Sequence, residues 1–199
     1  GFHWSRPDRT AHIPASRTNA WDRGYVQSIG NICVIKDDKL WFYYSGFAGN
    51  TNKVNVFWQR NGMYDNGSTG VAFLRRDGFV SLEAGPEGGD ILTRSVTFRG
   101  RNLFVNGFGE ITAEVTDTEG KVIEPFTFSG CVPLTGDSTK AMLNWKNGDL
   151  KKLAGKPVRF RFRVKSGGLY AFWVSADPSG RSGGYLAGGG PDYAGLKDD

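Results

Sequence analysis

The sequence of 199 residues has only two cysteines, two histidines and two methionines, and it has no apolar run of about 18 residues. The lack of such a run excludes a transmembrane helix. His3 and His12 have no cysteine or carboxylate at a spacing that suits zinc. Neither a Gly-x-x-x-x-Gly-Lys phosphate loop nor a Gly-x-Ser-x-Gly nucleophile elbow is present. We therefore expect no membrane span, no metal site and no cofactor.

The two cysteines, Cys33 and Cys131, each lie in a short apolar run. The two runs fall in segments that we assign to different domains, so we expect two buried thiols rather than a disulfide. Two cysteines do not decide the redox compartment of the protein.

Positive charge is present but mild, with a formal net charge of +5. The densest basic cluster, within residues 159–164, alternates arginine with apolar residues. Such alternation is typical of one solvated strand face, and it is not a stripe for nucleic acid. We therefore expect no nucleic-acid partner.

Glycine and aromatic residues are abundant, with 29 Gly, 14 Phe, 7 Tyr and 6 Trp. Almost every apolar run is short and is bounded by Gly, Asn, Asp or Pro, which predicts strands and tight turns. The expected strands are residues 25–35, 40–46, 69–76, 79–82, 91–98, 102–106, 110–116, 122–128, 141–145, 158–164 and 169–175, with one helical turn near 149–153. The sequence therefore predicts an all-β protein.

The composition changes at two places along the chain. The polar, glycine-rich segment 83–90 interrupts the strand pattern, and we expect a domain boundary there. Beyond it, closely spaced strands with alternating faces predict a two-sheet β-sandwich over residues 84–176. Residues 177–199 form a glycine-rich C-terminal tail, which either docks through Tyr185 and Tyr193 or is a mobile terminus.

Several strings of residues, weak singly, form a recognisable set. They are Gly-Phe-His-Trp at 1–4, Trp-Asp-Arg-Gly at 21–24, the aromatic strand 40–46, and the strand pair around 69–72 and 75–79, with 103–106, Gly120, 155–159 and 169–173 downstream. The set, over roughly residues 1–176, resembles the C-terminal part of the family-32 (invertase-like) glycoside hydrolases and their relatives in families 43 and 130. The resemblance implies that residues 1–83 are the last blade or blades of a five-bladed β-propeller, followed by the C-terminal β-sandwich.

The resemblance also implies a function and a partner. Enzymes of this family hydrolyse poly- or oligosaccharides with paired carboxylates in a funnel at the propeller axis. Their Asn-Asp-Pro-Asn, Arg-Asp-Pro and Glu-Cys motifs are absent here, so the catalytic residues stay unknown and none is assigned to this chain. We expect the chain to complete the funnel and brace the propeller, with the preceding blades supplied as a separate or cleaved chain. Secretion or a periplasmic location is a further implication.

The candidate substrate-binding residues follow from the segment just before the first strand. Trp21 would stack on a sugar ring, Asp22 and Arg23 would hydrogen-bond sugar hydroxyls, and Tyr25 and Gln27 would share one strand face beside them. In the alternative interpretation, Asp22 caps a turn and Trp21 packs between blades.

Two other functions remain open at the level of sequence. In the first, the whole chain is a non-catalytic carbohydrate-binding β-sandwich module. In the second, it is a structural piece of a surface complex. Trp145 and Trp173 would be a glycan platform in the sandwich, although core packing is the stronger interpretation of both.

Overall fold

The computed structural model describes the chain except for residues 1–4, 6–7, 16–17, 50–61, 187 and 199, and the side chains of 31 and 32. The motif at residues 1–4 lies outside the described residues. The described elements are strands apart from one short 3-10 helix, so the predicted all-β class is confirmed. The chain forms two compact units, one of residues 1–36 and 40–73 and one of residues 37–39 and 74–199.

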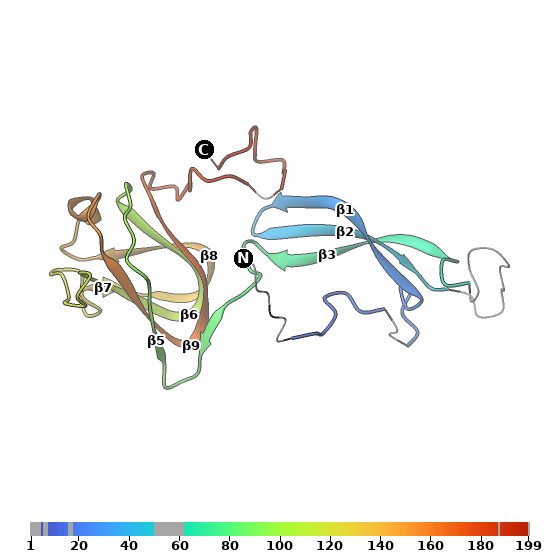
Figure 1. Cartoon of the computed structure of the whole chain (residues 1–199), viewed down its shortest axis with the longest axis horizontal. Coiled ribbons are helices and arrows are strands. Elements are labelled where there is room, and N and C mark those ends of the chain that lie inside the picture. The colour runs from blue at the N-terminus through green and yellow to red at the C-terminus, as the bar shows by residue number, and fades with distance from the viewer. Residues whose placement is uncertain (1–4, 6–7, 16–17, 50–61, 187, 199) are drawn as a thin grey trace. The chain divides into compact units, whose positions relative to one another are not determined.

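The first unit contains a meander of three strands, drawn from blue to blue-green in Figure 1. The strands are β1 (Tyr25–Lys36), β2 (Lys39–Phe47) and β3 (Gly67–Arg75), in the sheet order β1-β2-β3. The turn between β1 and β2 places Asp37 at a φ of 53°, a conformation that Asp tolerates better than most residues. The predicted strand–turn–strand pattern of this segment is therefore present.

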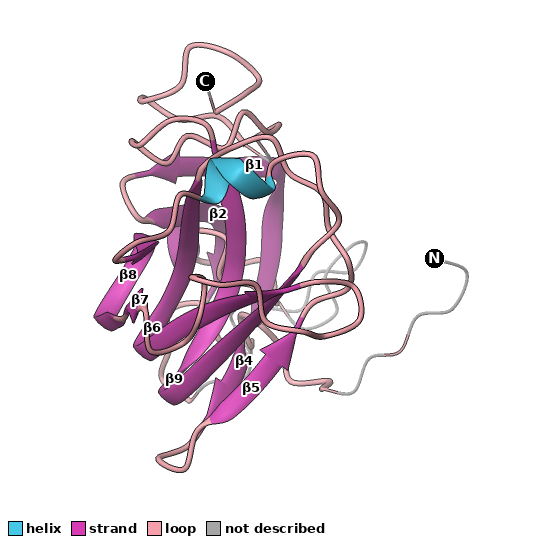
Figure 2. Ribbon diagram, turned by 90° about the vertical axis from the view of Figure 1, so that its left-hand side faces the viewer, coloured by secondary structure: helices cyan, strands magenta, loops and turns pink. Residues whose placement is uncertain are grey.

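The second unit is built around one six-stranded sheet of order β4-β9-β6-β8-β7, in which β5 also pairs with β9. The strands are β4 (Leu82–Ala84), β5 (Gly89–Leu92), β6 (Asn102–Thr116), β7 (Cys131–Val132), β8 (Leu134–Trp145) and β9 (Arg159–Ser175). Figure 2 shows β4 and β5 along the same side of β9, which they pair at successive stretches. The predicted helical turn is present as η1 (Leu150–Leu153), and the Asp149 side chain accepts a hydrogen bond from the Lys151 amide at its N-terminus.

The two long strands, β6 and β9, each merge two strands that the sequence predicts separately. The register of their pairing shifts between Asn106 and Gly107 and again between Phe108 and Glu110. A Cβ on Gly109 would lie 2.5 Å from the Ser166 carbonyl oxygen, so only glycine allows the two backbones to approach this closely. The glycines that looked like turn signals are therefore bends within continuous strands.

The core of the second unit lies on one face of its sheet. Alternate residues of β6, among them Ile111, Ala113 and Val115, have no exposed surface, and neither do Phe160 and Phe162 of β9. The arginines that alternate with these phenylalanines in β9 lie on the opposite face, as the alternation predicts. The remaining members of the core are Leu103, Val105, Phe126, Cys131, Leu143, Trp145, Leu150, Leu153, Val158, Val164 and Leu169.

The finer architecture differs from the expectation. The compact units divide between Phe73 and Leu74 rather than within 83–90. The segment 83–90 lies instead inside the six-stranded sheet, because β4 and β5 on either side of it both pair with β9. Residues 122–128 form turns and one isolated bridge rather than a strand. The propeller blade and the two-sheet sandwich are not confirmed.

The C-terminal tail contacts the second unit at several points. The Trp173 indole donates a hydrogen bond to the Gly180 carbonyl at 2.9 Å, and the Tyr193 ring lies 5.4 Å from the Arg76 guanidinium. Tyr185, in contrast, is 80% exposed. Docking of the tail therefore involves Tyr193 and not burial of Tyr185.

The two cysteines are free thiols in different units. Cys131 is buried in the core, whereas Cys33 is only half-buried, so the expectation of two buried thiols holds for Cys131 alone. Burial raises the pKa of both thiols above the ordinary value, which lowers the thiolate fraction and the reactivity at neutral pH.

Candidate functional site

The Trp21 indole packs directly over two glycines in the first unit. A Cβ added to Gly46 of β2 would lie 2.6 Å from one indole carbon, and a Cβ added to Gly70 of β3 would lie 2.7 Å from another. The indole stacks on the Tyr44 ring at a centroid distance of 5.6 Å, yet Trp21 stays 43% exposed. An exposed indole fixed in this way offers a rigid apolar surface, which we name the Trp21 platform (Trp21, Tyr44, Gly46 and Gly70).

Asp22 lies beneath the Trp21 platform. Its side chain has no exposed surface, and the Tyr44 hydroxyl donates a hydrogen bond to its Oδ2 atom at 3.0 Å. A carboxylate in this position holds Tyr44 under the indole, and it is out of reach of a ligand in solvent. The expected direct contact between Asp22 and sugar hydroxyls therefore does not fit this arrangement, whereas a positioning role does.

The other candidate residues are not gathered around Trp21. Arg23 is exposed and donates from Nε to the Ala48 carbonyl at 3.0 Å. Tyr25 packs edge-on to Tyr64 at 4.8 Å and lies 6.1 Å from the Phe47 ring. Because Phe47 follows Gly46 in β2, its side chain points to the opposite sheet face from the Trp21 platform.

Gln27 is exposed two residues after Tyr25 in β1. Alternation along a strand places these two side chains on the same face, away from the Trp21 platform. Trp21 and Asp22 therefore lie on one face of the three-stranded sheet, and Tyr25 and Gln27 lie on the other.

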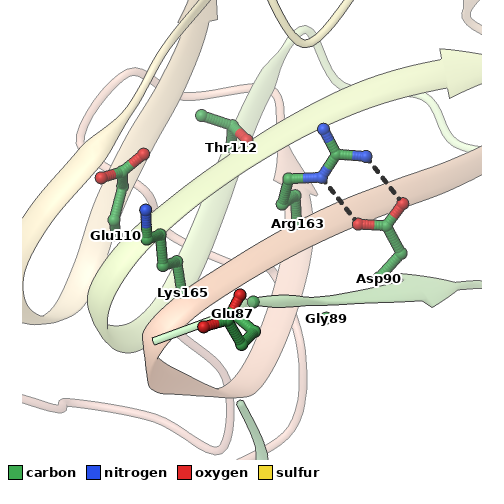
Figure 3. A pocket seen from close by; sticks show the side chains of 8 residues that line it. Glu87, Gly89, Asp90, Glu110, Thr112, Arg163 and Lys165 are labelled. Atoms are coloured by element: carbon green, nitrogen blue, oxygen red, sulfur yellow. Dashed lines mark hydrogen bonds and ion pairs between the residues drawn. The ribbon is translucent and has the colours of Figure 1, made fainter. Parts of the chain in front are cut away.

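A second candidate site, which we did not predict from the sequence, lies on the outer face of the six-stranded sheet (Figure 3). It is a depression of about 580 Å³ between β5, β9 and β6. We name it the polar groove, and its lining residues are Glu87, Gly88, Gly89, Asp90, Glu110, Thr112, Arg163 and Lys165. Every side chain in this lining is polar or charged.

Strand register explains why these side chains meet. Arg163 of β9 is opposite Asp90 of β5 on one side and opposite Thr112 of β6 on the other. Lys165 is opposite Glu110 in the next outward-facing row. Residues directly opposite in an antiparallel pair have neighbouring side chains, so the two rows place five polar side chains side by side.

Arg163 is fixed from two directions within the polar groove. Its Nε and Nη2 atoms donate to the two Asp90 carboxylate oxygens at 2.8 and 3.0 Å, and its guanidinium carbon lies 4.3 Å from the Phe128 ring centroid. The hydrogen bonds from Arg163 hold the pKa of the Asp90 carboxyl below its ordinary value, and the same bonds raise the pKa of Arg163. Both groups therefore stay charged at neutral pH as a bidentate pair.

The other polar side chains of the groove have no hydrogen-bonding or ionic partner among the described residues. Within the part of the chain that the structure describes, the side chains of Glu87, Glu110, Thr112 and Lys165 form no hydrogen bond or ion pair. Lys165 and Glu110 are opposite in register without an ion pair between them. These groups are thus available to a ligand that carries both donors and acceptors.

The signal for the groove was present in the sequence only in part. The alternation of polar and apolar residues over 110–116 and over 159–164 predicts two half-wet strands. Nothing in one sequence states that these strands are neighbours, or that Asp90 pairs with β9. The pairing is therefore what the sequence interpretation missed.

Among the described residues, no group of three or more His, Cys, Asp or Glu side chains is arranged to hold a metal ion. The short helix in the same residues is neither long nor apolar enough to cross a membrane.

Comparison of the chain with known proteins gives no family assignment. No family model matches it, and no significant match is found among curated proteins or solved structures. The functional argument therefore depends on the residues themselves.

Proposed function

We propose that this chain binds carbohydrate through the Trp21 platform and that it does so as the C-terminal portion of a glycoside hydrolase. The observation that carries the proposal is the Trp21 indole, which is held rigidly over Gly46 and Gly70 and is still 43% exposed. Apolar sugar faces stack on such a surface, and an indole that is already fixed loses little entropy when it binds.

The sparse core of the first unit supports the idea of a missing partner. Its buried apolar side chains, among the described residues, are Ile35, Leu40 and Tyr44. Tyr64 and Phe73 are 38% and 51% exposed on the same small unit. A three-stranded sheet with so little buried surface gains stability from neighbouring sheets, as a propeller blade does. Preceding blades, on a separate or cleaved chain, would supply those neighbours and the catalytic carboxylates.

The test of carbohydrate binding uses affinity electrophoresis of the full chain in gels that contain glucan, mannan, xylan or fructan. Trp21→Ala is expected to abolish retardation in the gel that retards the wild-type chain. The matched control is Phe73→Ala, because Phe73 is equally an exposed aromatic but packs against Trp41 on the other sheet face. Equal retardation of wild type and Trp21→Ala would refute the role of the platform.

The glycoside hydrolase part of the proposal has its own test. Native mass spectrometry of material purified from its natural source is expected to show a second polypeptide, and hydrolysis is expected only in its presence. Sugar binding by the chain as a lone species, without any hydrolytic partner, would instead favour the non-catalytic binding module. The extracellular or periplasmic location belongs to the same proposal and is supported by the resemblance alone.

A further inference from the structure

We infer that the polar groove is a second ligand site, selective for an amino-sugar unit. The groove lies on the six-stranded sheet of the second unit, and neither the Trp21 platform nor any candidate residue from the sequence contributes to it. The inference depends on the proposed function only for the sugar class of the ligand. Its charge selectivity comes from the groove itself.

The charge selectivity follows from which charged side chains of the groove are ion-paired and which are not. Asp90 and Arg163 neutralise each other in their bidentate pair. The carboxylates of Glu87 and Glu110 and the ammonium of Lys165 remain, which leaves two negative charges against one positive charge. A ligand with one positive charge complements this remainder, whereas an anionic ligand is repelled.

The hydrogen-bonding groups of the groove suit a sugar ring. The two carboxylates accept from hydroxyl or ammonium groups, Lys165 donates, and the Thr112 hydroxyl does either. A ring that carries vicinal hydroxyls and one protonated amine offers the matching donors and acceptors. Charge-assisted bonds from carboxylates to an ammonium are the strongest of these contacts.

The backbone at the rim leaves room for such a ring. Pro86 and Glu87 form the centre of a turn closed by the Gly88 amide, which donates to the Gly85 carbonyl at 3.0 Å. Gly88 has a φ of +78°, which favours glycine, and with Gly89 it keeps this edge of the groove free of side chains. The rigid Arg163–Asp90 pair, supported by the Phe128 ring, forms part of the floor.

The test is a titration of the full-length, ¹⁵N-labelled chain with three oligosaccharides that differ in charge. The probes are a glucosamine trisaccharide, its N-acetylated neutral counterpart and a galacturonic acid trisaccharide. The titration is run at mildly acidic pH, which keeps the glucosamine amines protonated. The expected result is a shift of the Gly88, Gly89, Thr112 and Lys165 amide signals with glucosamine, at least about fivefold weaker binding of the neutral sugar, and no shift with the acidic sugar.

Substitutions separate the groove from the Trp21 platform. Glu110→Gln is expected to weaken glucosamine binding about tenfold, because it removes one of the uncommitted carboxylates. The matched control is Glu119→Gln, an exposed carboxylate in the turn after β6, which should have no effect. Trp21→Ala should leave the groove shifts unchanged.

Other results would overturn the inference or its charge argument, and they can be told apart. Shifts confined to the surroundings of Trp21 would overturn the groove site and leave the proposed function standing. Shifts at the groove that survive Glu110→Gln, or that the acidic sugar produces equally well, would overturn the charge argument. The absence of groove shifts with all three sugars would also overturn the inference, whatever happens at Trp21.

Discussion

Gly167 of β9 lies directly against the carbonyl oxygen of Phe108 in β6, so closely that an added Cβ would overlap this oxygen. The neighbouring approach of Gly109 to the Ser166 carbonyl is nearly as close. At this point the backbones of β6 and β9 approach each other more closely than any residue with a Cβ would allow. This contact allows each strand to bend while the ladder continues on both sides.

Gly167→Ala is expected to destabilise the second unit by about 3 kcal/mol or more, because the new methyl group forces the two backbones apart. Hydrogen exchange of the β6 and β9 amides measures the loss of stability. Gly85→Ala is the matched control, since an added Cβ there meets no atom within 4 Å. Equal protection of the two variants would contradict the close-approach argument.

Asn106→Ala is expected to cost about 1–3 kcal/mol, the usual penalty for leaving buried polar partners unsatisfied. Asn106 is 1% exposed; its Oδ1 atom accepts from Arg75 Nε at 2.5 Å, and its Nδ2 atom donates to the Arg76 carbonyl at 2.6 Å. Urea denaturation of the variant measures the cost. The exposed Asn144 of β8 provides the control, because Asn144→Ala should change stability by less than about 0.5 kcal/mol.

Asp90→Asn is expected to reduce stability at neutral pH by on the order of 0.5–1 kcal/mol, as for a partly exposed bidentate pair. The pKa of Asp90 is lowered in the folded state by hydrogen bonds from Arg163. The unfolded chain therefore binds a proton first as the pH falls. The stabilisation is fully present above the ordinary carboxyl pKa and disappears as the pH falls through the lowered value.

The measurement is the unfolding free energy of wild type and Asp90→Asn at neutral and at strongly acidic pH. The two proteins should differ at neutral pH and converge in acid, and high salt should shrink the neutral difference. A difference that persists unchanged in acid would show that Asp90 contributes through packing rather than through its charge.

The turns and strand faces of this protein were accessible from local sequence. Asp37 and Asp77 have positive φ in the turns that the sequence predicts, and Asp149 caps the predicted helical turn. Alternation likewise identified the wet face of residues 159–164. These features depend on residues near each other in the chain, where propensity and periodicity are informative.

The candidate site was accessible to a smaller degree. Trp21 was recognisable as an aromatic beside a polar segment, but its exposure is set by Gly46 and Gly70 on two other strands. Asp22 looked available for a ligand, and burial beside Tyr44 removes it from solvent. Exposure is a property of the packed structure, so a sequence string does not reveal it.

The sequence by itself determined the all-β class, the succession of strands and turns, and the polar-apolar alternation of the long strands. Tertiary structure alone decided that Asp90 lies beside Arg163, because the two residues are 73 positions apart in the chain. Glycines allow continuous strands where local signals suggested breaks, and register then fixes which charges meet. The physical reason is that backbone pairing is non-local: it brings together side chains whose separation along the chain carries no information about their distance in space.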